Sequence, residues 1–268
     1  IVITVEKQDM PQKGKILVTK TGETFASVQV SGDGVADKDG NLAEGENLYT
    51  PVYSVTGQAG AVYEVLACED IITPDGTVRA SSGEVVDTIT TDAEGRGETK
   101  ELYLGKYQVV EKTAPEGFVL NIEIHEVELS YAGQEVAVTE ADTAFYNEHQ
   151  KVTVELTKTL ERDETFGIGN QGEIQNVAFG LYAAEELTAA DGSVIPADAL
   201  LEILFCNADG KATFQTDLPF GKFYVKEIAT DQHYLLSDKI YPVEFSYQGQ
   251  ETAVVSISVS DGDAIENE

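Results

Sequence analysis

The chain has no tryptophan, a single methionine and only two cysteines among its 268 residues. It also lacks an apolar run of the roughly 18 residues that a transmembrane helix requires, and no signal peptide or anchoring tail is visible. We therefore expect no membrane insertion. Cys68 and Cys206 each lie inside an apolar stretch, so buried free thiols are expected rather than a disulfide. If such a chain has to last outside the cell, it needs a covalent staple of another kind.

Basic residues are scarce as well. The 17 lysines and arginines face 48 acidic residues, which gives a net charge of −31. This balance argues against nucleic acid and against anionic membrane surfaces as partners. The plainest interpretation of the charge is a solvated acidic surface. Apolar content of 42% and a length of 268 residues are sufficient for two globular domains, each with its own core.

What the chain does contain is an internal repeat. Six pairs of segments match in the same order, and they are residues 13–20 with 151–158, 63–70 with 179–186, 75–78 with 191–194, 93–96 with 208–211, 104–107 with 220–223, and 130–135 with 246–251. We therefore predict a first domain at residues 13–148 and a second at residues 149–268. Residues 1–12 are expected to be the end strand of a preceding domain or a linker. The first repeat is longer, mostly between residues 31 and 60, and this Gly-, Asp- and Glu-rich insertion is predicted to lie on the surface.

Alternating apolar residues predict that both repeats consist mainly of β-strands. The alternation is clear at residues 16–19, 107–111, 122–129 and 254–259, and Gly-containing turns separate such runs. One short helix is expected at residues 196–204. Short, regularly spaced strands with glycine turns predict an all-β sandwich or a partly open barrel.

Each repeat carries a lysine, a glutamate and an asparagine at corresponding places. Lys20, Glu111 and Asn147 form the set in the first repeat. Their second-repeat counterparts are Lys158, Glu227 and Asn267. Strand alternation places all six side chains on the faces that carry the apolar residues, so they are expected to point into the cores.

Buried charges must pair or become neutral, and burial lowers the pKa of a lysine while it raises that of a glutamate. A neutral lysine amine is a nucleophile, and a protonated glutamate can polarise an asparagine amide and transfer protons. The chemistry predicted from the triad is attack of the lysine Nζ on the asparagine Cγ with loss of ammonia, which forms an intramolecular isopeptide bond. The alternative is a buried Lys–Glu ion pair with the asparagine as a hydrogen-bond partner.

Both repeats resemble the collagen-adhesin B-type, or SpaA-like prealbumin-fold, domains of Gram-positive cell-surface proteins and pilins. The family signature Gly-x-Tyr-x-x-x-Glu-x-x-Ala-Pro-x-Gly-Tyr is similar to residues 105–118, whereas the second repeat has Thr230-Asp-Gln-His233 in place of Ala-Pro-x-Gly. The resemblance implies two tandem prealbumin-like (inverse Ig-like) β-sandwich domains. It also implies cross-links Lys20–Asn147 and Lys158–Asn267 between first and last strands, with Glu111 and Glu227 as catalysts.

The resemblance further implies a structural stalk segment of an adhesin or pilin-like protein, on the cell-wall-attached surface of a Gram-positive bacterium. Its partners would be neighbouring domains of the same longer chain, and it would be no enzyme beyond a single self-crosslinking turnover. The alternative is a ligand-binding module that contacts a host matrix protein or glycan through residues 31–60. The family's pilin motif, a Trp-led segment ending in Tyr-Pro-Lys, is missing, because Tyr241-Pro242 is followed by Val243.

We expect no cofactor and no metal site. His125, His149 and His233 lie far apart in sequence and show no metal-ligand spacing. The acidic segment at residues 33–46 has the character of a calcium loop. However, the positions that an EF-hand gives to Gly and Glu hold Leu42 and Leu48, so an acidic turn is the favoured interpretation.

Overall fold

The computed structural model describes residues 10–31 and 47–267, the last of these for its backbone alone. Two compact units make up the chain. Unit 1 comprises residues up to 23, residues 55–149 and residues 249–251, and unit 2 comprises residues 24–54, 150–248 and 252 onward. Residues 24–54 precede most of the first repeat in the chain, yet they belong to unit 2.

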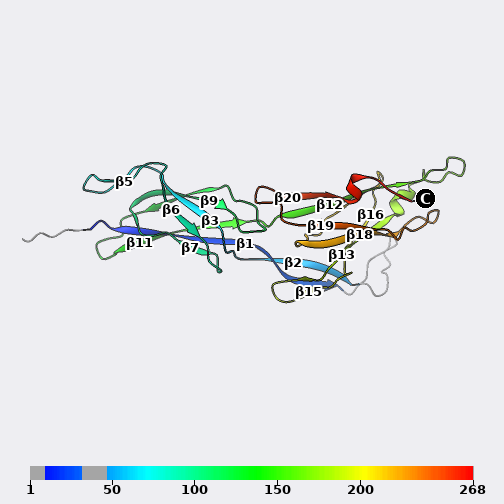
Figure 1. Ribbon diagram of the computed structural model, residues 1–268, viewed down its shortest axis with the longest axis horizontal. Helices are drawn as coiled ribbons and strands as arrows, with labels where there is room; N and C mark the ends of the chain where they lie inside the picture. The colour runs from blue at the N-terminus through cyan, green and yellow to red at the C-terminus, as the bar shows by residue number, and fades with distance from the viewer. Residues whose placement is uncertain (1–9, 32–46, 268) are drawn as a thin grey trace, which may run out of the picture. The chain divides into compact units, whose positions relative to one another are not determined.

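Unit 1 is built from two sheets and a small two-stranded lobe (Figure 1). Its strands are β1 (Lys13–Ser31, up to Glu23), β3 (Val62–Ala67), β4 (Ile71–Ile72), β5 (Val78–Ala80), β6 (Val85–Thr90), β7 (Arg96–Glu98), β8 (Leu102–Tyr103), β9 (Gly105–Thr113), β10 (Ile124–Leu129) and β11 (Val138–Asn147). One sheet has the order β10-β9-β3-β6, and in the other β1 pairs with β11, β7 and β8. β1 and β11 run parallel, so the first and last strands of the unit are neighbours.

The core of unit 1 follows from the alternation in its strands. In β1 the buried positions include Ile16, Val18 and Lys20, and in β9 they are Tyr107, Val109 and Glu111. The intervening residues are exposed or half-buried. The apolar side chains of these faces form one hydrophobic cluster, and a lysine and a glutamate enter it from opposite sheets.

Unit 2 repeats this arrangement and adds one strand to it. Its elements are β2 (Leu48–Gly57), β12 (Lys151–Leu160), η1 (Glu173–Asn176), β13 (Ala178–Ala183), β14 (Leu187–Thr188), β15 (Val194–Ile195), β16 (Leu200–Phe205), β17 (Lys211–Phe214), β18 (Gly221–Ala229), β19 (Ile240–Phe245), β20 (Val254–Ser258), η2 (Val259–Gly262) and β21 (Ile265–Asn267). β12 pairs with β17, β20 and β21, whereas β2, β16, β13, β18 and β19 follow one another in the second sheet. β2 is the added strand, because its residues come from the insertion in the first repeat.

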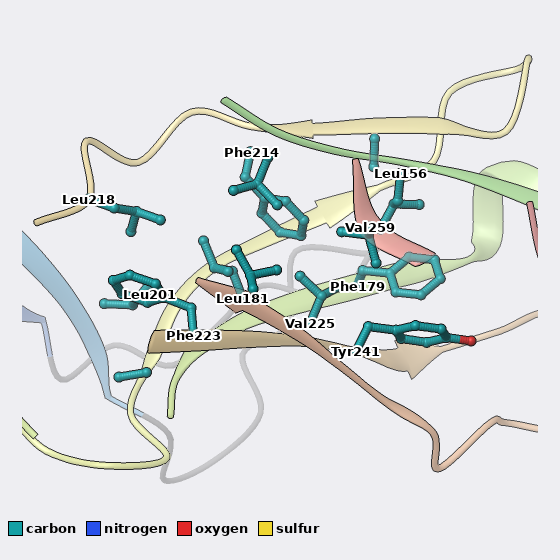
Figure 2. Close-up of a cluster of buried hydrophobic side chains, with 14 of the residues drawn as sticks. Leu156, Phe179, Leu181, Leu201, Phe214, Leu218, Phe223, Val225, Tyr241 and Val259 are labelled. Atoms are coloured by element: carbon teal, nitrogen blue, oxygen red, sulfur yellow. The ribbon is translucent and has the colours of Figure 1, made fainter. Parts of the chain in front are cut away.

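The core of unit 2 lies between these two sheets (Figure 2). Phe179, Leu181 and Val225 come from one sheet and Leu156 and Phe214 from the other, and all five are almost fully buried. Phe25, Val28 and Tyr49 pack against the same cluster. The segments 24–31 and 48–54 therefore contribute apolar side chains to the core of unit 2.

The architecture confirms the predicted all-β class with two tandem β-sandwich domains. The helix expected at residues 196–204 is wrong. Residues Leu200–Phe205 form β16, because they pair with β13 in the middle of a sheet and tertiary pairing outweighs local helix preference. Both cysteines are free, with Cys206 buried and Cys68 half-buried. In the part of the chain that the structure describes, no helix is long and apolar enough to cross a membrane.

Candidate functional site

The three predicted residues of the first repeat meet inside unit 1. The Nζ of Lys20 lies 2.8 Å from Oε1 of Glu111. The Nδ2 of Asn147 donates a 2.9 Å hydrogen bond to Oε2 of the same carboxylate. The exposed fractions of the three residues are 0%, 2% and 2%. One carboxylate therefore bridges an amine and a carboxamide in a site that excludes water.

The backbone explains why these side chains converge. In the parallel pair of β1 and β11, Lys20 faces Phe145 and Gly22 faces Asn147. Lys20 and Asn147 are thus two residues apart in register and project to the same side of the sheet. β9 of the other sheet brings Glu111 to them.

Two further groups hold the Glu111 carboxylate, and the sequence analysis assigned neither of them. The Tyr63 hydroxyl donates to Oε1 over 3.3 Å, and the backbone N–H of Asn121 donates to Oε2 over 2.8 Å. Burial and the neighbouring carboxylate raise the pKa of Tyr63, so its hydroxyl stays a donor at any physiological pH. Tyr63 is visible in the sequence as a core position of an alternating strand, but only its pairing with Glu111 reveals the contact.

The electrostatics of Lys20 are those of a desolvated amine. Burial lowers the pKa of Lys20, and the hydrogen bond and charge of Glu111 oppose this shift. Oδ1 of Asn147 is a buried atom without a hydrogen-bond partner among the described residues. The contacts with Glu111 therefore leave part of the desolvation cost of the site uncompensated.

Unit 2 places the second-repeat residues in the same way. Nζ of Lys158 lies 3.5 Å from Oε2 of Glu227, with exposed fractions of 1% and 3% for the two residues. Burial again lowers the pKa of the lysine, and the charge of Glu227 opposes the shift. In the pair of β12 and β21, Lys158 faces Ile265 and Leu160 faces Asn267. Asn267 therefore has the register that Asn147 has in unit 1, while its side chain lies outside the described residues.

The two centres differ in their surroundings. The position of Tyr63 is taken by Phe179, which faces Glu227 as Tyr63 faces Glu111. Cys206 lies close enough to Lys158 and Glu227 for electrostatic coupling. Burial raises the pKa of Cys206 to about 12, so the thiol stays neutral and behaves as a small apolar side chain.

A glycine turn fixes each lysine from the backbone side. The N–H of Lys20 donates to the carbonyl of Gly95 over 2.6 Å, and the N–H of Lys158 donates to the carbonyl of Gly210 over 2.7 Å. Both glycines have a φ of +76°. A β-carbon on either glycine would overlap the carbonyl oxygen of the lysine. Only glycine fits these turns, which correspond to the repeated motif at residues 93–96 and 208–211.

The remaining candidates are a metal site and a ligand-binding insertion. Among the described residues, no group of three or more His, Cys, Asp and Glu side chains is arranged to hold a metal ion. The acidic segment at residues 33–46, with the calcium-loop motif, lies outside the described residues. So does half of the proposed ligand-binding insertion, and its described part includes β2, which is a sheet strand of unit 2 over residues 48–54.

Comparison with known families agrees with this architecture. Residues 55–144 and 170–260 each match the SpaA prealbumin-like fold domain. The chain belongs to this family. No curated protein sequence matches the chain.

Several solved structures are similar to the chain. The Bacillus anthracis TIE protein is 18% identical with a TM-score of 0.50, and the match covers 96% of this chain and 34% of that one. A streptococcal ancillary pilin is 16% identical with a TM-score of 0.30, covering 97% of this chain and 66% of that one. The shaft pilin SpaA from Lactobacillus rhamnosus GG is 12% identical with a TM-score of 0.27, covering 96% and 98%. The chain thus spans about a third of the first structure, and this likeness supports the fold alone.

Proposed function

We propose that the chain is a stalk segment of a Gram-positive cell-surface protein, and that each SpaA-type domain is stapled by an autocatalytic Lys–Asn isopeptide bond. The observation that carries the proposal is the buried set of Lys20, Glu111 and Asn147, with the carboxylate in contact with both prospective reactants. A buried ion pair at this site carries a large desolvation penalty, because both charged groups have lost their hydration. Formation of the isopeptide bond turns the lysine Nζ into a neutral amide nitrogen, so no charged amine remains buried.

The proposed reaction needs only the groups present. Glu111 accepts a proton from Nζ of Lys20, whose lowered pKa favours the neutral amine. The amine then attacks Cγ of Asn147. Glu111 gives this proton to Nδ2, with which it is already hydrogen-bonded, and takes up a second proton from Nζ as ammonia leaves and the amide forms. One C–N bond forms and one breaks, so no cofactor is required, and the reaction happens once per domain.

The position of the bonds suits a stalk. Each would join the first strand of a domain to its last, which in unit 1 are the parallel neighbours β1 and β11. By the loop-entropy rule for disulfides, closing loops of roughly 110 to 130 residues is worth on the order of 4–5 kcal/mol. Pulling force that enters through one end strand and leaves through the other would pass through the covalent bond. The free cysteines are consistent with this staple taking the place of disulfides.

The family membership supports a cell-wall-attached, extracellular location with neighbouring domains of a longer chain as partners. A structural role is also favoured over an enzymatic one, since the proposed chemistry consumes its own reactants. No observation on the described residues favours the alternative of a host-ligand site in the 31–60 insertion.

Intact-mass spectrometry tests the proposal directly. The purified chain should be lighter than its sequence mass by two ammonia molecules. Glu111→Gln should restore one ammonia, because the amide cannot take up the proton, and Glu227→Gln should restore the other. Glu128→Gln, an exposed position on the neighbouring strand β10, is the matched control and should keep both losses. A mass equal to the sequence mass would refute the cross-links and leave the buried ion pairs as the answer.

A further inference from the structure

The two units differ at one sheet edge. In unit 2, β16 lies between β13 and β2, and Leu200 of β16 pairs with Leu48 of β2. Leu200 is only 3% exposed. β2 and the second half of β1 together supply two extended segments, residues 24–31 and 48–54, which we call the strap. The strap therefore covers the edge of the β16 sheet.

The small lobe of unit 2, formed by β14 and β15, is hydrogen-bonded to the strap. The N–H of Ala190 donates to the carbonyl of Phe25, and the N–H of Asp191 donates to the carbonyl of Ala26, both over 3.0 Å. The N–H of Val28 donates to Oγ of Ser193 over 2.9 Å. The docking site for the strap thus consists of the β16 edge and this lobe.

Unit 1 has the corresponding edge, and no strap lies on it among the described residues. Its β6 corresponds to β16, because Leu66 pairs with Val85 as Tyr182 pairs with Leu200, and both ladders shift register at that point. β6 is the outermost strand of its sheet, and no described strand pairs with its other side. Val85 is 44% exposed, compared with 3% for Leu200.

The lobe of unit 1, formed by β4 and β5, adds two exposed apolar side chains. Ile72 and Val78 pair with each other across the lobe and are 58% and 52% exposed. Together with Val85 they form what we call the β6 edge patch. An uncovered strand edge flanked by apolar side chains is a site at which another strand can add.

We propose that the β6 edge patch of unit 1 is a docking site for an extended β-hairpin donated by another repeat of this kind, equivalent to the strap. The argument is the strap itself, since it already occupies the homologous edge of unit 2. The strap of this chain is engaged there, so the occupant of unit 1 must come from a different repeat. Strand addition supplies backbone hydrogen bonds, while the apolar side chains supply the buried area.

The sequence of the unit 1 lobe indicates which contacts of the unit 2 lobe a docked strand could repeat. Asp75 and Thr77 stand at the positions of Asp191 and Ser193, and can donate and accept in the same way. Pro74 stands at the position of Ala190 and has no N–H, so one of the three polar contacts is absent. The donated hairpin should therefore rely more on Ile72, Val78 and Val85 than the strap relies on the lobe of unit 2.

A peptide of residues 24–54, added to the full chain, serves as the probe. Hydrogen exchange of the amides in Val85–Thr90 should slow as the peptide is titrated, because added backbone pairing protects that edge. Val78→Asp should raise the dissociation constant about tenfold or more, since a charge would be buried in the contact. Ile122→Asp, at an apolar side chain that is 80% exposed elsewhere on unit 1, is the matched control and should leave binding unchanged.

Three results would overturn the proposal. One is unchanged exchange in β6 at saturating peptide. Another is slowed exchange confined to β16 and its neighbours, which would mean that the peptide only exchanges with the chain's own strap. The third is an equal loss of binding in Val78→Asp and Ile122→Asp, which would indicate non-specific association. The experiment does not depend on the isopeptide bonds, so the two proposals can fail separately.

Discussion

A buried lysine is rare in folded proteins, because removing an ammonium group from water costs several kcal/mol, and this chain buries one in each unit. The cost is tolerated where the surrounding groups are held in place. Around Lys20 the carboxylate of Glu111 is fixed by Tyr63 and by the Asn121 backbone. The backbone of Lys20 is fixed by Gly95. At the residue scale, the candidate site therefore depends on neighbours that hold the Lys20 amine and the Glu111 carboxylate in fixed positions.

The glycine turns allow this positioning to be tested. Gly95→Ala should destabilise the protein by about 1–3 kcal/mol more than Gly76→Ala. Both substitutions place alanine at a positive φ, +76° and +80°, but only at Gly95 does the new methyl group meet the Lys20 carbonyl. Urea unfolding of the two variants measures the difference. Equal urea midpoints for the two variants would show that the turn can rearrange to accept the methyl group and that Gly95 does not fix Lys20.

At the scale of elements, the strap changes how the chain divides. The repeat predicts contiguous domains at residues 13–148 and 149–268, whereas unit 2 includes residues 24–54. β1 is 19 residues long, and its counterpart β12 is 10, so only the first repeat extends far enough to form a strap. The extra length of the first repeat thus has a structural role in the stability of the other unit.

Phe25→Ala should therefore weaken unit 2, although Phe25 belongs to the first repeat in sequence. Phe25 is partly buried against the unit 2 core, so we expect a loss of about 2 kcal/mol, below the 3–5 typical of a fully buried phenylalanine. Hydrogen exchange in β13 and β16 should accelerate by roughly thirtyfold, and β3 and β9 should be unaffected.

The control for this variant is Val30→Ala, on the same strand but with a side chain that is 50% exposed. It should leave exchange in both units unchanged. Faster exchange in β3 and β9 after Phe25→Ala, with β13 and β16 unaltered, would assign the strap to unit 1 instead.

At the scale of the whole molecule, charge is the dominant feature. The net charge of −31 is spread over a chain in which the described surface ion pairs are few and at least partly exposed, such as Lys15–Glu98 and Lys112–Glu64. Exposed pairs contribute little to stability. Repulsion among the carboxylates therefore outweighs attraction, and folding brings these like charges closer together.

Added salt should accordingly stabilise the protein. Between 10 and 300 mM sodium chloride the screening length falls from about 30 Å to well under 10 Å, and we expect the melting temperature to rise by a few degrees. Calorimetry at both salt concentrations measures the shift, with sucrose in place of salt as a control for general solvent effects. A melting temperature that falls with salt would mean that ion pairs, and not repulsion, dominate the surface.

The sequence by itself determined the all-β class, the duplication, most strands and their buried faces, and the glycine turns. These are local properties, because alternation along a strand states which side chains point inward, whatever the strand pairs with. For the same reason Lys20, Glu111 and Lys158 could be placed in the cores before any fold was known. The cross-links that they are proposed to form remain a prediction.

Only the tertiary structure decided which strands lie beside one another. Three long-range facts illustrate this: Leu48 pairs with Leu200, Val85 pairs with Leu66 and with no second strand in the described part of the chain, and Tyr63 reaches Glu111. The predicted helix at residues 196–204 failed for the same cause, since pairing with β13 draws Leu200–Phe205 into a strand. Strand partners are chosen by the total burial and hydrogen bonding of the whole sheet, and neither quantity can be read from the order of residues along one segment.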